Sequence, residues 1–182
     1  RIFREKGGAI AHCPSANLKL SSGIAAVQTM LDNKVVVGIG TDGPASNNDL
    51  DMFEEMRLAA LLAKTQPLNP TALPAKMALY MATLGGARVN GLDKVTGSIE
   101  VGKAADVIVM DAHPLHNTPH YDFNPDNIYS RIVYAGKAAD VAHTMVAGQW
   151  LMRDRTLQTI DETELRIEAT GYSKKIGEFL AN

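Results

Sequence analysis

The feature that most restricts the fold is the segment VVVGIG at residues 35–40, which is apolar throughout and is followed two residues later by the carboxylate of Asp42. A strand with one solvated face alternates apolar and polar residues, whereas a parallel strand covered on both faces does not. The segment AIAHC at 9–13 has the same character, and apolar residues at helical spacing over 24–33 lie between the two. The pattern predicts a strand–helix–strand unit of the α/β class.

Further helices are expected after this unit. The residues PSANLKLSSG at 14–23 predict a polar loop. Apolar residues over 52–63 make one continuous helical face, which Asn48 or Asp49 can cap. A second helical region is expected over about 74–91. These helices would cover the sheet.

The character of the chain changes at Thr96. Short strands are predicted over 106–110, 130–136 and 141–154, the last with a hairpin turn at AGQW. The Pro-, His- and Asn-rich stretch between the first two predicts a long loop. An amphipathic helix is expected over 161–180. The sequence thus predicts a small β unit and a terminal helix after the α/β part.

Composition excludes several classes of protein. The 182 residues are 46% hydrophobic and 21% charged, which is typical of a globular domain, and the net charge of −2 gives no basic face for nucleic acid. No apolar run approaches the ~18 residues of a membrane span. The single cysteine, Cys13, excludes an internal disulfide framework and indicates a reducing, cytoplasmic location. We expect neither nucleic acid nor membrane as a partner.

Asp42 is the first candidate for chemistry. α/β barrels and open α/β sheets place their reactive groups at the carboxyl ends of parallel strands, where Asp42 would lie. A carboxylate there can ligate a divalent metal and accept a proton from water that the metal acidifies. The alternative is an aspartate that hydrogen-bonds the amides of its own turn, because TDG is common in turns.

His12 ends its own predicted strand in the same way, so that a His and an Asp would reach one edge of the sheet. A structural histidine is the alternative. Neighbouring polar residues could orient a polar substrate or could be turn formers and caps. These residues are Ser15, Asn17, Ser46, Asn47 and Asn48. Cys13 is interpreted as a small buried hydrophobe.

A cluster of histidines later in the chain carries less weight. His113, His116 and His120 have spacings that suit a metal site on a helix, but Pro114 and Pro119 interrupt any helix there. We therefore expect a solvated loop at these residues.

The two early segments together, AHCPSANLKLSSGIAAV and VGIGTDGPASNNDLDMFEEMRLAALLAK, resemble the amidohydrolase superfamily. The resemblance is to the branch that contains 5-methylthioadenosine/S-adenosylhomocysteine deaminases and triazine chlorohydrolases. The later GSIEVGKAADVIVMD is similar to the superfamily's C-terminal segment. The likeness implies a distorted (β/α)8 TIM-type barrel with a small composite β-sandwich. On that fold 1–95 would be the C-terminal portion of the barrel with its last two strands, 96–160 part of the β-sandwich, and 161–182 a C-terminal helix.

The resemblance also implies roles for particular residues. Asp42 would bind one divalent metal, usually zinc, and take the proton from the attacking water. Ser46 and Asn17 would line the substrate pocket, and His12 would orient the substrate. The substrate would be a small nucleoside or heterocycle, and homo-oligomers are common in the superfamily.

The chain also departs from that family. Members carry a His-x-His pair on the first barrel strand and further metal-binding histidines on the fifth and sixth, and this sequence has no His-x-His. One Asp and one His cannot hold a catalytic zinc, which needs about three protein ligands. We therefore expect the C-terminal portion of a longer deaminase, inactive and aggregation-prone in isolation. The alternatives are a triazine chlorohydrolase, a guanine or cytosine deaminase, or a catalytically incomplete remnant or assembly subunit.

Overall fold

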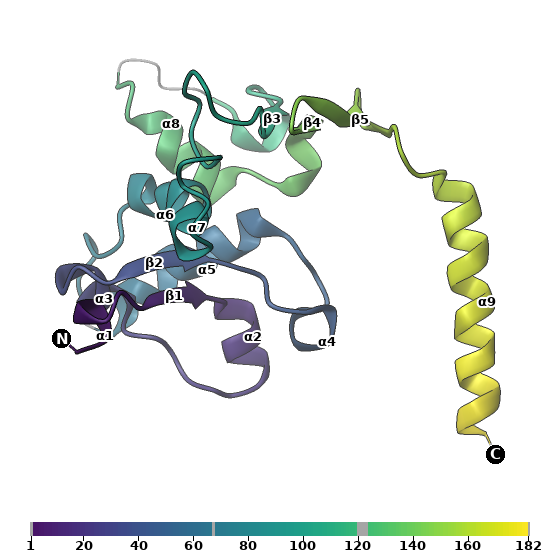
Figure 1. The fold of residues 1–182 in the computed structure, drawn as a ribbon, viewed down its shortest axis with the longest axis horizontal. Coiled ribbons are helices and arrows are strands. Elements are labelled where there is room, and N and C mark those ends of the chain that lie inside the picture. Colours follow the sequence, from purple (N-terminus) through teal and green to yellow (C-terminus); the bar gives the residue numbers. More distant parts are fainter. Residues whose placement is uncertain (1, 67, 120–123, 182) are drawn as a thin grey trace.

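The computed structural model describes residues 2–66, 68–119 and 124–181. Two small sheets and the helices around them make up the body of the molecule, and a long C-terminal helix extends from it (Figure 1).

The first sheet confirms the predicted strand–helix–strand unit. Strands β1 (Ala9–His12) and β2 (Val36–Ile39) pair in parallel, with His12 opposite Ile39. Helix α3 (Val27–Asp32) lies between them in the chain, and the short α1 (Ile2–Glu5) precedes β1. The predicted polar loop after β1 is wrong in part, because it contains helix α2 (Pro14–Lys19). Pro14 occupies its first turn, where a proline is compatible with a helix because the missing N–H needs no partner.

The helices that follow β2 form the densest part of the molecule. They are α4 (Pro44–Asn47), α5 (Met52–Thr65), α6 (Ala75–Ala82) and α7 (Leu84–Val89). Asp51 caps α5 by accepting from two backbone N–H groups, so the predicted caps Asn48 and Asp49 were wrong. The region predicted as one helix is divided at Thr83, whose φ of −117° and ψ of −101° are not helical.

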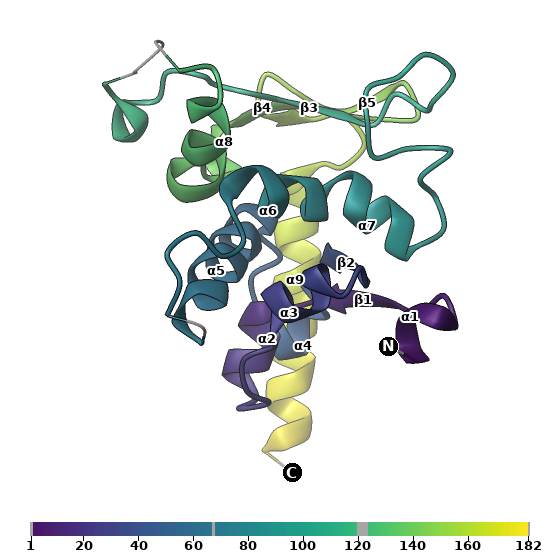
Figure 2. The same ribbon diagram turned by 90° about the vertical axis from the view of Figure 1, so that its left-hand side faces the viewer.

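The core lies between β2 and these helices. Buried apolar side chains of α5 and α6 pack with those of β2 and with Val133; the cluster includes Val37, Ile39, Phe53, Met56, Leu73, Met81 and Val133. β2 and α7 approach closely, because a Cβ added at Gly38 would lie 2.8 Å from Gly86 Cα. Figure 2 shows α6 and α7 between the first sheet and the second sheet.

The second sheet is antiparallel, in the order β3-β4-β5-β6. Its strands are β3 (Val107–Met110), β4 (Val141–Val146), β5 (Gln149–Arg153) and β6 (Thr156–Leu157). The predicted hairpin turn is confirmed: Ala147 and Gly148 link β4 to β5 with φ of 50° and 80°. Positive φ at both central residues is the geometry of the tight hairpin turn that matches strand twist.

The strand predicted over 130–136 was wrong. Here helix α8 (Asn127–Ser130) continues into a π-helical turn, η2 (Arg131–Ala135), with Gly136 N–H donating to Arg131 O at 2.8 Å. Val133 in this turn is fully buried against the core. Burial of that side chain against helices outweighs the strand preference of β-branched residues. Two 3₁₀ helices, η1 (Leu115–Asn117) and η3 (Ala138–Asp140), flank the region.

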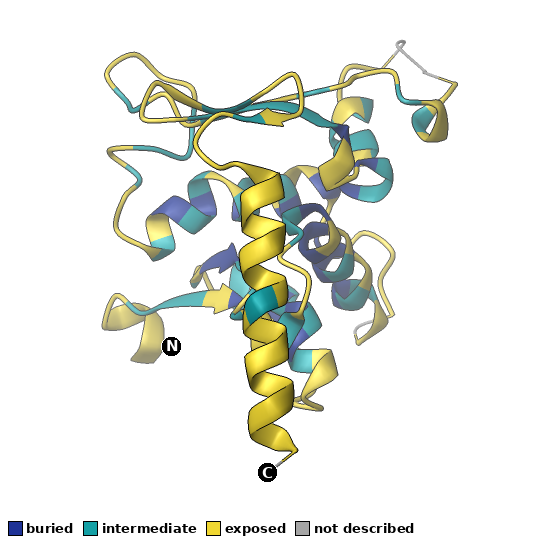
Figure 3. Ribbon diagram, turned by 90° about the vertical axis from the view of Figure 1, so that its right-hand side faces the viewer, coloured by how far each residue is buried: buried dark blue, intermediate teal, exposed yellow. Residues whose placement is uncertain are grey.

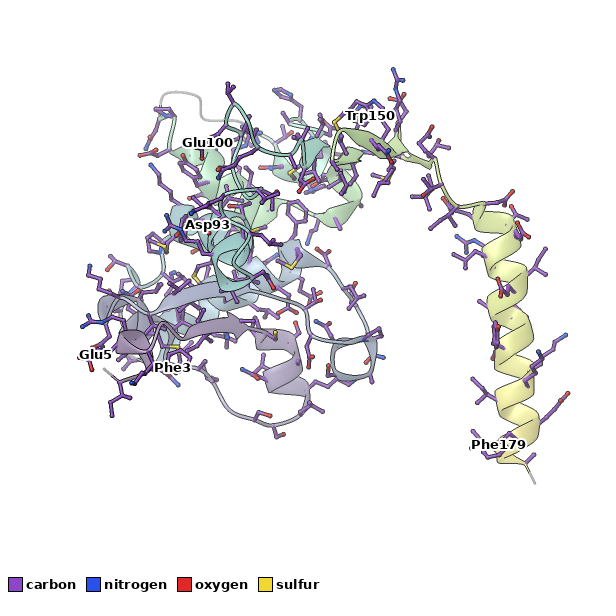
Figure 4. All side chains as sticks on the ribbon, in the orientation of Figure 1. Phe3, Glu5, Asp93, Glu100, Trp150 and Phe179 are labelled. Atoms are coloured by element: carbon purple, nitrogen blue, oxygen red, sulfur yellow. The ribbon has the colours of Figure 1, made fainter. Side chains whose placement is uncertain are left out.

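The predicted terminal helix is α9 (Glu162–Leu180), capped by Asp161. None of its residues is buried, and Figure 3 colours almost all of it as exposed. Phe179, near its far end, stands well away from the body of the molecule (Figure 4). No helix within the described ranges is both long and apolar enough to cross a membrane.

Candidate functional site

The parallel register brings the segments that follow β1 and β2 to one edge of the first sheet. Gly40 N–H donates to His12 O at 3.0 Å, which extends the pairing one residue beyond β2. Asp42 follows Gly40 by two residues, beyond the same end of the sheet at which His12 ends β1. The sheet therefore presents both candidate residues from neighbouring strands, as the two apolar segments predicted.

Asp42 is exposed and its backbone has a φ of 61°. That conformation is uncommon for residues other than glycine, although aspartate tolerates it better than most. Ser46 Oγ donates to Asp42 Oδ2 at 2.6 Å. This hydrogen bond, together with one from the Gly43 backbone, lowers the pKa of the Asp42 carboxyl. Asp42 is thus an exposed, ionised carboxylate held by the start of the following helix.

His12 has a different environment. Its side chain is buried, and burial lowers its pKa to about 4, so the ring is neutral near pH 7. Nδ1 is buried and makes no hydrogen bond to any described residue. A buried nitrogen without a partner costs free energy, on the order of 1–3 kcal/mol. Within the described residues, this buried nitrogen of His12 has no hydrogen-bond partner.

Cys13 and Asn17 lie in the segment after β1. Cys13 is half-buried, less than expected, and the pKa of its thiol is raised first by burial and then by the charges of Asp42 and Glu55. Gly40 lies next to it, since a Cβ there would be 3.4 Å from Cys13 Sγ. Asn17 is half-buried and lies in α2, the short helix that contains Ser15 and begins directly after Cys13.

Two residues that sequence reasoning missed connect the segments after β1 and β2. The carboxylate of Glu55 accepts from the Ser15 backbone N–H at 3.2 Å and from Asn47 Nδ2 at 2.8 Å. Lys19 Nζ donates to Ala45 O at 2.8 Å and also to the side chain of Asn48. The detectable signal for Glu55 was its position: it lies three residues after Met52, on the apolar face of α5.

The ligating side chains of this chain do not by themselves fit a catalytic zinc. Among the described residues no group of three or more His, Cys, Asp or Glu could hold a metal ion, whereas such a site needs about three protein ligands. Asp42 offers one carboxylate. In the later cluster His116 Nε2 lies 3.1 Å from the buried Asp140 carboxylate, which is a structural contact, and His120 lies outside the described residues.

Comparison with known proteins gives concordant results. Residues 1–151 match the Amidohydrolase family. The chain is 45% identical over 177 residues, 97% of its length and 39% of the relative's, to a 5-methylthioadenosine/S-adenosylhomocysteine deaminase of Haloarcula marismortui. It spans about two fifths of the length of such relatives.

Solved structures agree. An adenosine deaminase from Xanthomonas campestris with bound zinc superposes with a TM-score of 0.90 at 40% identity, covering 96% of this chain and 39% of that one. A zinc complex of atrazine chlorohydrolase from Arthrobacter aurescens superposes with a TM-score of 0.81 at 28% identity, covering 93% of this chain and 36% of that one. The resemblance seen in the two early segments is confirmed: the chain belongs to the amidohydrolase family.

Proposed function

We propose that this chain is the C-terminal part of a hydrolytic deaminase that acts on methylthioadenosine or S-adenosylhomocysteine. The observation that carries the proposal is that His12 and Asp42 lie at the same end of two neighbouring parallel strands. In addition, relatives of this chain are named 5-methylthioadenosine/S-adenosylhomocysteine deaminase. Residues 1–95 would complete a (β/α)8 barrel, 96–160 would form part of a composite β-sandwich, and 161–182 would be the segment of the terminal helix, which the structure describes over Glu162–Leu180.

The reaction in this proposal replaces the purine 6-amino group by oxygen. Water forms a bond to C6, the C6–N bond breaks, and ammonia leaves. Asp42 would be the proton acceptor in this proposal: its carboxylate is ionised near pH 7, and the hydrogen bond from Ser46 Oγ would orient it. One divalent metal, zinc in this proposal, would be held by Asp42 with side chains outside this chain and would acidify the water.

Ser46, Asn17 and His12 are proposed to line the substrate pocket. The unpaired Nδ1 of His12 supports this role, because a buried donor or acceptor needs a partner that the described residues do not supply. The neutral ring can donate one hydrogen bond and accept another, which suits a polar heterocycle. A cytoplasmic location and a homo-oligomeric state stay predictions, the first resting on the single cysteine and the second on analogy with the family.

A chlorohydrolase is the second candidate, favoured by the similarity to the atrazine enzyme. There chloride would leave in place of ammonia at the attacked carbon. Guanine or cytosine deamination would use the same addition of water. Fold alone does not choose among these substrates.

The test uses the complete gene product that contains this chain. We expect ammonia release from methylthioadenosine or S-adenosylhomocysteine, about one zinc per chain, and a fall in kcat of at least ~100-fold in Asp42→Asn, because the amide cannot accept the proton. Asp49→Asn, which changes an exposed acid just after α4, is the control and should retain activity. Chloride release from a chlorotriazine without ammonia from either nucleoside would select the second candidate. Neither activity in a zinc-loaded protein would reject both.

A further inference from the structure

Glu55 is a buried acid on the otherwise apolar face of α5. It lies on α5 between Phe53 and Met56, and only 1% of it is exposed. A buried carboxylate is costly unless hydrogen bonds compensate it, and an apolar residue of similar volume is often at least as stable. The presence of Glu55 on this face therefore calls for an explanation beyond packing.

The two oxygens of Glu55 join segments that are far apart in the sequence. Oε2 accepts from the backbone N–H of Ser15, just after β1, and Oε1 accepts from the side-chain amide of Asn47, after β2. The helix α5 that carries Glu55 is anchored in the core by Met56 and Ala59. One carboxylate on a rigid helix thus fixes both segments that carry the candidate site.

Asn47 extends this connection to Asp42. Its Nδ2 donates to Thr41 O at 2.7 Å as well as to Glu55. Because both partners are acceptors, the amide nitrogen must face them, and Glu55 helps to fix that orientation. Thr41 immediately precedes Asp42, whose positive φ must be maintained by its surroundings. The hydrogen bonds form a continuous path from α5 to the backbone carbonyl of Thr41, the residue before the candidate catalytic Asp42.

We propose that Glu55 is a positioning residue, which holds Asp42 in place through Asn47 and Thr41 and locks the segment after β1 against the segment after β2. The inference rests on the proposed function for its effect on catalysis. Its structural part, the ordering of both segments, can be measured without activity.

The test compares Glu55→Gln with Glu54→Gln in the complete gene product. Glutamine keeps the shape of Glu55 but can accept only one of its two hydrogen bonds at full strength, because its other end is an amide donor. Glu54 is the matched control, since it is the exposed neighbour on the same helix. We expect Glu55→Gln to lower kcat for methylthioadenosine ~10-fold or more with KM changed less than ~3-fold, because small misplacements of catalytic groups are costly. Glu54→Gln should change neither.

Hydrogen exchange provides the readout that does not depend on activity. In Glu55→Gln, peptides covering 13–19 and 41–48 should exchange ~10-fold faster, whereas peptides of α6 should not change. Faster exchange throughout the molecule with normal kcat would mean that Glu55 only stabilises the fold. Unchanged exchange in 41–48 would overturn the proposal.

Asn47→Ala is a second variant in case Glu55→Gln folds poorly. It removes the link to Thr41 and leaves the Ser15 contact of Glu55. We expect Asn47→Ala to cause the same loss in kcat. The double variant of Glu55→Gln and Asn47→Ala should lose about as much as the more damaging single variant, because the effects of two residues in one hydrogen-bond network do not add. Additive losses would contradict a shared path. If the wild type shows no deaminase activity, the proposed function fails, and hydrogen exchange still decides the role of Glu55.

Discussion

The two candidate residues at the edge of the first sheet have opposite electrostatic environments. Asp42 is exposed, and a hydrogen bond from Ser46 lowers its pKa, whereas His12 is buried and its pKa is lowered by loss of solvation. Near pH 7 the carboxylate of Asp42 is charged and the imidazole of His12 is neutral. In the proposed reaction, the first would accept a proton and the second would hydrogen-bond a neutral heterocycle.

His12 gives a pH prediction at this scale. Its pKa falls from 6.5 to about 4 on folding, so below pH 6.5 the unfolded state binds the proton more readily than the folded state. The contribution of His12 to stability is complete above pH 6.5 and is lost as the pH falls toward 4, by on the order of 3 kcal/mol. Unfolding free energies of the complete gene product between pH 7.5 and 4.5 should fall more steeply in the wild type than in His12→Gln. Equal slopes would show that the ring titrates normally.

At the scale of single elements, strands β1 to β5 and the long helices α5 and α9 could be predicted from the sequence because each carries a local signal, whereas the two-residue strand β6 was not predicted. VVVGIG lacks alternation, α5 has a full apolar face, and the hairpin contains Gly148 at a residue with positive φ. The strand predicted over 130–136 failed because tertiary burial of Val133 decides its conformation. The division between α6 and α7 could not be predicted, because the sequence signal for it is no stronger than a pair of glycines.

The cap of α5 gives a prediction that separates local from distant effects. Asp51 accepts from the N–H groups of Phe53 at 2.7 Å and Glu54 at 3.3 Å. Asp51→Ala should reduce the stability of the first turn of α5 by about 1 kcal/mol. Hydrogen exchange of the peptide covering 51–57 in the complete gene product measures this loss. Asp49→Ala, which removes a carboxylate that does not cap α5, is the control, and an equal effect of both would contradict the assignment.

The contact between β2 and α7 gives a second prediction for an element. An alanine Cβ at Gly38 would lie 2.8 Å from Gly86 Cα and 3.0 Å from Val89 Cγ2, so the helix must move away from the strand. Gly38→Ala should destabilise the protein by about 1–3 kcal/mol, as overpacking does. Gly43→Ala is the control for stability, because nothing lies within 4 Å of the added atom. Melting temperatures of the two variants should differ, with only the first lowered by several degrees.

At the scale of the whole molecule, the site depends on more than the described residues supply. The sequence alone indicated that one Asp and one His were too few for a catalytic zinc, and the structure adds no third ligand among the residues it describes. The position of Glu55 on the apolar face of α5 was visible in the sequence, but its partners were not, because its hydrogen bonds to Ser15 and Asn47 join residues 40 and 8 positions away. Such non-local contacts have no spacing pattern to detect.

Expressed by itself, the 182-residue chain should therefore be inactive and should self-associate. Within the described residues, β1 is paired with a neighbouring strand along one edge and its other edge is unpaired. On α9, four apolar or aromatic side chains are 49% to 80% exposed: Leu165, Tyr172, Ile176 and Phe179. Open strand edges and contiguous apolar surface both favour association. Light scattering of the isolated chain should show species larger than 19.6 kDa, zinc analysis should find well below one ion per chain, and methylthioadenosine should not be deaminated. A zinc-loaded, active monomer of that mass would mean that the residues of this chain suffice for the reaction, and the requirement for ligands from outside it would be wrong.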